Sequence, residues 1–199
     1  MIILKDPKDK NQYPKASNIS SFAIEYADEI KKGLAAVADK LEDAKHLMGS
    51  KRIFVGGNGG SSAISDHLAC DFEKGASKPT INLSSRPALL SAIANDYGYE
   101  FTLSWQLMAA NVDPWDTVIL ISSSGNSSNI IEAARAAQMH GAKILSLTGF
   151  DGGKLKTMSD VSLHVPLNNY GQVEDCHQAI MHILAQWHYL THGSKKTMP

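Results

Sequence analysis

Residues 117–148 have the sequence TVILISSSGNSSNIIEAARAAQMHGAKILSLT, and this stretch decides the fold. Thr117–Ser122 and Lys143–Thr148 are short apolar runs, typical of strands that a sheet buries on both faces. Ser127–His140 lies between them, is rich in alanine and predicts a helix. A strand, a helix and a second strand in this order predict a βαβ unit with parallel strands.

The same alternation continues on both sides of this unit. Further strands are predicted at Arg52–Gly57, Thr80–Leu83 and Val161–Val165, and further helices at Ser61–Lys74, Arg86–Ala94, Glu100–Ala110 and about Val173–His192. The predicted fold class is α/β, with a doubly wound, mainly parallel five-stranded sheet flanked by helices.

The N-terminal part is predicted to be a helical extension. Apolar side chains recur at spacings of three or four from Phe22 to Ala44, which predicts one or two amphipathic helices over Ile19–Met48. Ser20 and Ser21 stand where the N-cap is expected. The apolar stripe packs either on its own domain or in an oligomer. We expect an N-terminal arm over 1–18, a single domain over 19–192 and a C-terminal tail over 193–199.

The composition excludes several classes of protein. Lys and Arg number 19 against 20 Asp and Glu, so the net charge of −1 predicts no nucleic-acid or membrane partner. Cys70 and Cys176 are too few for a disulfide framework and indicate a reducing, cytoplasmic setting. The N-terminal sequence MIILKDPKDKNQYPK lacks the apolar core of a signal peptide, and no apolar run approaches the length of a membrane span.

Two loops follow predicted strands at the sheet edge where such folds bind ligands. The first, Gly56–Ser62, has the sequence GGNGGSS, whose glycines let the backbone approach a ligand closely. The second, Ser122–Ser128, has the sequence SSSGNSS. It combines hydroxyls with a helix N-terminus, which suits a phosphate monoester. A serine-rich turn with one N-cap residue is the alternative for this second loop.

Neither loop has the pattern of a nucleotide site. In the first, Ser62 stands where the dinucleotide fingerprint has its last glycine, and no acidic residue ends the strand Thr80–Leu83. The second lacks the lysine of a P-loop. We therefore expect no nucleotide cofactor.

Two pairs of titratable residues share helix faces. His67 and Asp71 are four residues apart on the helix after the glycine loop, and Glu174 and His182 are eight apart on the last helix. Each pair taken alone is also typical of an ordinary helix surface.

Several motifs jointly resemble the sugar isomerase (SIS) domain family, and within it the phosphoheptose isomerase branch. These motifs are GGNGGSS, AIANDYG at 92–98, SSSGNS at 122–127, LTGFDGG at 147–153 and the last helix with its spaced histidines. The resemblance covers about residues 20–192. It implies the SIS fold and an aldose–ketose isomerase that converts sedoheptulose 7-phosphate to D-glycero-D-manno-heptose 7-phosphate through an enediol. Such a product feeds activated heptose for lipopolysaccharide or capsule.

The resemblance also implies roles for particular residues. The implied catalytic residues are Asp71, His182 and Glu174. The implied substrate-binding residues are Asn58, Gly59, Gly60, Ser61, Asn95, Asp96, Ser122, Ser123, Ser124 and Ser127. One zinc ion per active site is implied, with the ligands His67, Asp71, Glu174 and His182. A homotetramer with sites at subunit interfaces is implied as well, with a dimer as the alternative.

The sequence departs from the family pattern at two positions. Asp71 stands where the family usually has glutamate, and Glu174 stands where it usually has glutamine. The first change shortens the side chain by one methylene, about 1.5 Å, and the second adds a negative charge. Two alternatives therefore stay open: a non-catalytic SIS module that binds a phosphosugar or a replication-initiation protein, and an isomerase of another phosphosugar.

Overall fold

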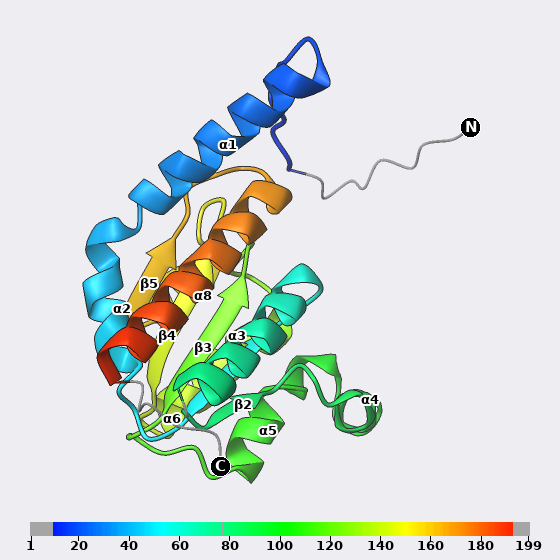
Figure 1. Cartoon of the computed structure of the whole chain (residues 1–199). Coiled ribbons are helices and arrows are strands. Elements are labelled where there is room, and N and C mark those ends of the chain that lie inside the picture. Colours follow the sequence, from blue (N-terminus) through cyan, green and yellow to red (C-terminus); the bar gives the residue numbers. More distant parts are fainter. Residues whose placement is uncertain (1–9, 77, 193–199) are drawn as a thin grey trace.

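Five parallel strands form one sheet in the order β2-β1-β3-β4-β5 (Figure 1). The computed structural model describes residues 10–76 and 78–192, so residues 1–9 of the predicted arm and the predicted tail 193–199 lie outside the described part. The strands are β1 (Ile53–Gly57), β2 (Thr80–Asn82), β3 (Thr117–Ser122), β4 (Lys143–Thr148) and β5 (Val161–His164). The register pairs Ile53 with Thr117 and Thr117 with Lys143, so these strands begin level with one another.

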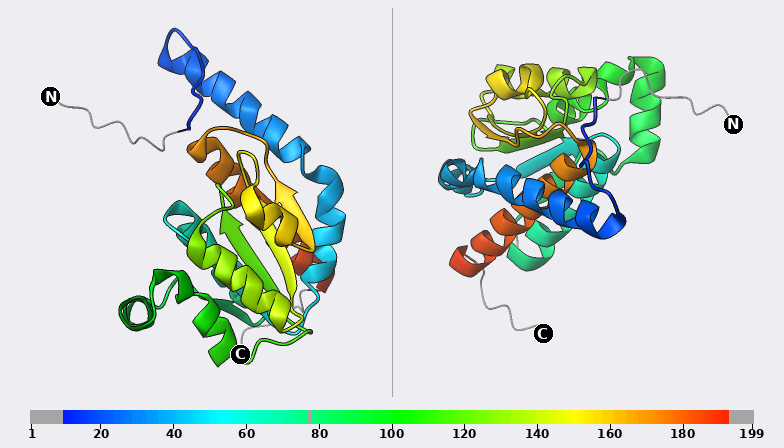
Figure 2. Two further views of the ribbon diagram at one scale, coloured as in Figure 1. Left: turned by 180° about the vertical axis from the view of Figure 1, so that it is seen from behind. Right: turned by 90° about the horizontal axis from the view of Figure 1, so that it is seen from above.

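Helices cover both faces of the sheet, as the continuous apolar strands predict (Figure 2). One face carries α1 (Ile19–Ala35), α2 (Leu41–Leu47), α3 (Gly60–Ala76) and α8 (Tyr170–His192). The other carries α5 (Ser104–Ala109), α6 (Ser128–Met139) and α7 (Gly153–Met158), with α4 (Pro87–Asp96) beside them. The predicted doubly wound α/β class is confirmed.

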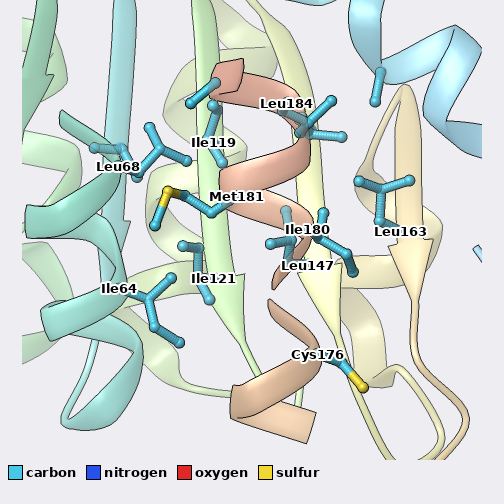
Figure 3. Close-up of a cluster of buried hydrophobic side chains, with 14 of the residues drawn as sticks. Ile64, Leu68, Ile119, Ile121, Leu147, Leu163, Cys176, Ile180, Met181 and Leu184 are labelled. Atoms are coloured by element: carbon cyan, nitrogen blue, oxygen red, sulfur yellow. The ribbon is translucent and has the colours of Figure 1, made fainter. Parts of the chain in front are cut away.

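The core between α3, α8 and the sheet positions the site. Ile64 and Leu68 of α3 and Ile180 and Met181 of α8 pack over the central strands (Figure 3). Both helices start at the carboxyl edge of the sheet and run back side by side (Figure 1). The first turns of α3 and α8 therefore lie near one another, as Gly60 and Glu174 do, and residues two turns further along both helices also meet, as His67 and Gln178 do.

Three local predictions were wrong. The helix expected over Glu100–Ala110 is a 3-10 turn at Tyr99–Phe101 followed by the separate helix α5. The glycine pair Gly152-Gly153 predicts a turn after β4, whereas Gly153 begins the short helix α7. The N-cap of α1 is Asn18, whose side chain accepts a hydrogen bond from the Ser21 backbone N–H while the Ser21 hydroxyl bonds back to Asn18.

Within the described residues, no helix is both long enough and apolar enough to span a membrane.

Candidate active site

The serine loop lies between the end of β3 and the start of α6. Its turn is closed by the backbone N–H of Gly125, which donates to the Ser122 carbonyl at 3.0 Å. Gly125 has φ +62°, a left-handed conformation that glycine adopts without strain. Ser127 is the N-cap of α6, yet its side chain makes no capping hydrogen bond. The first N–H groups of α6 therefore point toward the loop without a side-chain cap.

The loop is held in place by the segment that follows β4. The N–H of Gly149 donates to the Ser123 carbonyl at 2.8 Å, and the N–H of Leu155 donates to the Gly125 carbonyl at 3.0 Å. The side-chain oxygen of Asn126 accepts a hydrogen bond from the Lys154 N–H at 3.1 Å. These backbone contacts fix the loop before any ligand binds.

A cavity of about 170 Å³ opens on this loop. It is lined by Asn58, Ser61, Ile121, Ser122, Ser123, Ser124, Ser127, Tyr170 and Glu174. None of these described lining residues is Lys or Arg. The hydroxyl oxygen of Ser123 is buried and finds no hydrogen-bond partner among the described residues, which leaves it for a ligand. Hydroxyls and a helix N-terminus around a small cavity suit an anion, so this cavity is the candidate phosphate site.

The glycine loop adjoins this cavity through Asn58. Asn58 and Asn129 exchange two side-chain hydrogen bonds, each 2.9 Å long, and the Tyr99 hydroxyl donates to Asn58 at 2.8 Å. Asn129 is the second residue of α6, so the pair connects the glycine loop with the serine loop. Sequence reasoning missed Asn129 and Tyr99, although Asn129 directly follows the serine motif.

Two turns further along α3 and α8, three predicted residues meet. His67 Nε2 lies 3.7 Å from an Asp71 carboxylate oxygen, and His182 Nε2 lies 4.0 Å from the other. The two imidazole rings are 4.9 Å apart at 82°. One ligand atom from each of the three lies within 4.8 Å of the others, which suits a divalent ion. Gln178, which the sequence analysis missed, places its amide nitrogen 3.0 Å from His67 and 3.1 Å from His182.

Glu174 lies apart from this cluster. A Cβ added to Gly60 would stand 2.7 Å from the Glu174 carboxyl carbon, so the carboxylate rests at the first residue of α3. The positive end of that helix favours a carboxylate there. Burial raises the pKa of Glu174, and the nearby charge of Asp175 raises it further. The structure thus places Glu174, a predicted zinc ligand, at the serine cavity and away from His67, Asp71 and His182.

Two further predicted residues also lie elsewhere. Asn95 and Asp96 end α4, are exposed or nearly so, and bond to each other at 2.8 Å. They do not line the serine cavity. His177 lies three residues after Glu174, a position from which the sequence predicts a structural role, with a place lining the site as the alternative. It is fully buried, and its Nε2 lies 3.2 Å from the Thr148 carbonyl. Burial lowers the pKa of His177 to about 4, which keeps the ring neutral inside the core.

The fold and the serine cavity together define a class of protein. A family model described as "SIS domain" matches residues 16–149 of the chain, so the chain is a SIS-domain protein. A phosphoheptose isomerase of Helicobacter pylori (strain P12) is 36% identical over an alignment of 173 residues, with 81% of this chain and 88% of that protein covered. One of Leptospira biflexa is 40% identical over 145 residues, with 69% and 74% covered.

Solved structures agree with these relatives. The phosphoheptose isomerase of Neisseria gonorrhoeae superposes with a TM-score of 0.77 at 31% identity, covering 84% of this chain and 97% of that one. The chain belongs to the phosphoheptose isomerase family and is an aldose–ketose isomerase. The resemblance identified from the motifs is confirmed, and a non-catalytic binding module is not favoured.

Proposed function

We propose that this chain interconverts sedoheptulose 7-phosphate and D-glycero-D-manno-heptose 7-phosphate. The observation that carries the proposal is the arrangement of two polar clusters along α3 and α8, with the serine cavity at the start of these helices and the His–Asp cluster two turns further along. The names of the relatives support the seven-carbon substrate. The product would supply activated heptose for lipopolysaccharide or capsule.

The length of the substrate fits this layout. Glu174 borders the serine cavity and lies eight residues before His182, a rise of about 12 Å along α8. A seven-carbon sugar phosphate in extended form spans roughly 10 Å from its C1 atom to its phosphorus, at about 1.2 Å per backbone bond. With its phosphate among the serine hydroxyls, the substrate would therefore bring C1 and C2 close to the cluster.

The chemistry needs two proton-transfer groups. Isomerisation removes a proton from C1 of the ketose, gives an enediol and returns a proton to C2, while a second proton moves between the O1 and O2 oxygens. We assign these transfers to Asp71 and His182, whose Oδ2 and Nε2 atoms are 4.0 Å apart. Glu174, with its raised pKa, would bond to the substrate between the two ends.

Zinc fits the residues of the cluster. His67, Asp71 and His182 would each contribute one ligand atom, which leaves Asp71 a second oxygen for proton transfer. When bound, the ion would polarise the carbonyl group and stabilise the enediolate.

The remaining predicted residues would hold the sugar. Asn58, Gly59, Gly60 and Ser61 offer polar groups beside the serine cavity. Asn95 and Asp96 lie away from it, so we propose that they complete the site of a second copy in a homotetramer.

The assembly and the compartment are proposed on separate observations. Ile183, Trp187 and Leu190 form an exposed apolar stripe along α8, which supports burial against another copy. A mass near four chains in light scattering after gel filtration is expected, and a mass of one chain would remove this proposal. Cys70 and Cys176 are both free thiols, which supports a reducing cytoplasmic location.

The decisive experiment follows sedoheptulose 7-phosphate by NMR with the purified protein and added zinc. We expect an aldoheptose 7-phosphate to appear, and His182→Gln to lower kcat by about 100-fold or more. His140→Gln, at the exposed end of α6, is the matched control and should keep wild-type rates. Ligand binding without turnover in the wild-type protein would contradict the proposed isomerase activity.

A further inference from the structure

The two imidazole rings of the cluster converge on the side chain of Gln178. Gln178 lies on α8 one turn after Glu174 and one turn before His182, so all three share a helix face. Its amide nitrogen is within hydrogen-bond distance of His67 Nδ1 and His182 Nε2. An amide N–H is a donor, so both ring nitrogens present a lone pair to the same point.

The distances from the Gln178 amide nitrogen to the two ring nitrogens are similar to those between neighbouring ligand atoms around one metal ion. Tetrahedral nitrogen and oxygen ligands at about 2.0–2.1 Å from zinc lie roughly 3.3 Å from one another. At His182 Nε2, the Gln178 amide nitrogen is 3.1 Å away and the nearest Asp71 oxygen 4.0 Å. At His67, the Gln178 amide nitrogen is 3.0 Å from Nδ1, whereas Asp71 is 3.7 Å from the other ring nitrogen, Nε2, so the ion would bind His67 through Nδ1. A half-turn of the amide group exchanges its nitrogen for its oxygen, which is a metal ligand.

We propose that Gln178 is the fourth ligand of the zinc site, with His67, Asp71 and His182, and that Glu174 is not a ligand. This inference rests on the proposed zinc site. The Glu174 carboxylate instead rests at Gly60, beside the serine cavity.

The charge of the ligand set gives this exchange a chemical consequence. Two neutral histidines, one carboxylate and one amide leave a net charge of about +1 around a divalent ion, whereas a second carboxylate would cancel it. An enediolate carries negative charge, and a positively charged site stabilises it more than a neutral site does. With the Gln178 amide as a ligand, the zinc site therefore keeps a net positive charge that stabilises the enediolate. With the Glu174 carboxylate as a ligand, the site would lose that charge.

Zinc affinity measures this proposal without any substrate. The metal-free full chain is titrated with Zn²⁺ against a fluorescent chelator, in parallel with Gln178→Ala, Gln178→Met and Glu174→Gln. We expect both Gln178 variants to weaken zinc binding by about 10–100-fold, and Glu174→Gln to change it by less than about threefold. Circular dichroism confirms that each variant is folded, and the methionine variant keeps the length of the side chain.

A second readout is the visible absorption of the Co²⁺-substituted protein, which reports the ligands directly. Gln178→Met should alter this spectrum and Glu174→Gln should leave it unchanged. Loss of zinc affinity in Glu174→Gln with wild-type affinity in Gln178→Ala would overturn the inference. So would a wild-type chain that binds no zinc. Zinc binding that depends on Gln178 in a protein without turnover of sedoheptulose 7-phosphate would instead refute only the proposed reaction.

Discussion

The conformation of Gly125 makes the serine loop sensitive to a single methyl group. Gly125 has φ +62°, and a Cβ at this position would lie 2.7 Å from the Gly152 carbonyl carbon and 3.2 Å from the Gly153 Cα. Both neighbours are backbone atoms that cannot rotate away. The left-handed conformation costs an alanine about 1–2 kcal/mol, and the forced backbone shift adds about 1–3 kcal/mol. We therefore expect Gly125→Ala to destabilise the fold by about 2–5 kcal/mol.

Gly59→Ala separates the two contributions. Gly59 has φ +56°, but a Cβ there meets nothing within 4 Å, so this control carries the conformational cost alone. Urea unfolding of both variants should show Gly125→Ala less stable by about 1–3 kcal/mol. Phosphate affinity, measured by calorimetry, should also fall in Gly125→Ala, because the clash with the Gly152 backbone displaces the serine loop. Equal stabilities for the two variants would refute the argument that the loop is fixed by contact with residues 149–153.

Three further variants test the charges and hydroxyls of the structure. Glu174→Gln should raise the melting temperature at pH 7. Folding raises the pKa of Glu174 above its ordinary value of 4.5, so at higher pH the ionised carboxylate destabilises the folded state, and glutamine carries no such charge. This gain should vanish below about pH 4, and a gain that persists there would contradict the pKa argument. Ser123→Ala should leave stability unchanged or raise it by up to about 1 kcal/mol, while weakening phosphate binding in calorimetry by about tenfold; unchanged binding would remove Ser123 from the anion site. Asp116→Ala should lower the free energy of unfolding, measured in urea, by about 3 kcal/mol. The Asp116 carboxylate accepts two hydrogen bonds from the Arg52 guanidinium, at 2.9 Å and 2.5 Å, and the variant loses both. A loss below about 1 kcal/mol would contradict this prediction.

The strands could be predicted from the sequence because burial on both faces leaves continuous apolar runs. The helix expected at 100–110 shows the limit of periodicity. The Thr102 hydroxyl donates to the Tyr99 carbonyl at 2.8 Å, a local bond that competes with helix continuation at that point. The helix α7 is six residues long, too short for a periodic pattern to identify.

The site was predictable where a motif joined neighbouring residues, and less so where two helices meet. The spacing of His67 and Asp71 places them on one helix face, but it cannot say what lies opposite. Gln178 carries no charge and belongs to no motif, so its approach to His67 appears once α3 and α8 lie side by side. Asn129 escaped prediction for the same reason, since its partner Asn58 is 71 residues away in the chain.

The topology of the sheet also bears on how the serine cavity, whose described lining includes no Lys or Arg, would hold the proposed phosphate in a chain with net charge −1. Parallel strands with helical crossovers place the starts of α3, α6 and α8 at the same edge, and Gly60, Ser128 and Tyr170 begin these helices. Each helix start carries roughly half a positive charge. The Glu174 carboxylate rests at the start of α3, and the first N–H groups of α8 donate to Asn11 and Asn169, so α6 is the start that faces the cavity without a side-chain cap. A phosphate monoester carries about −1.5 to −2 at pH 7. The start of α6 therefore offsets only part of this charge, and in the proposed site hydrogen bonds from the serine hydroxyls would add to the binding.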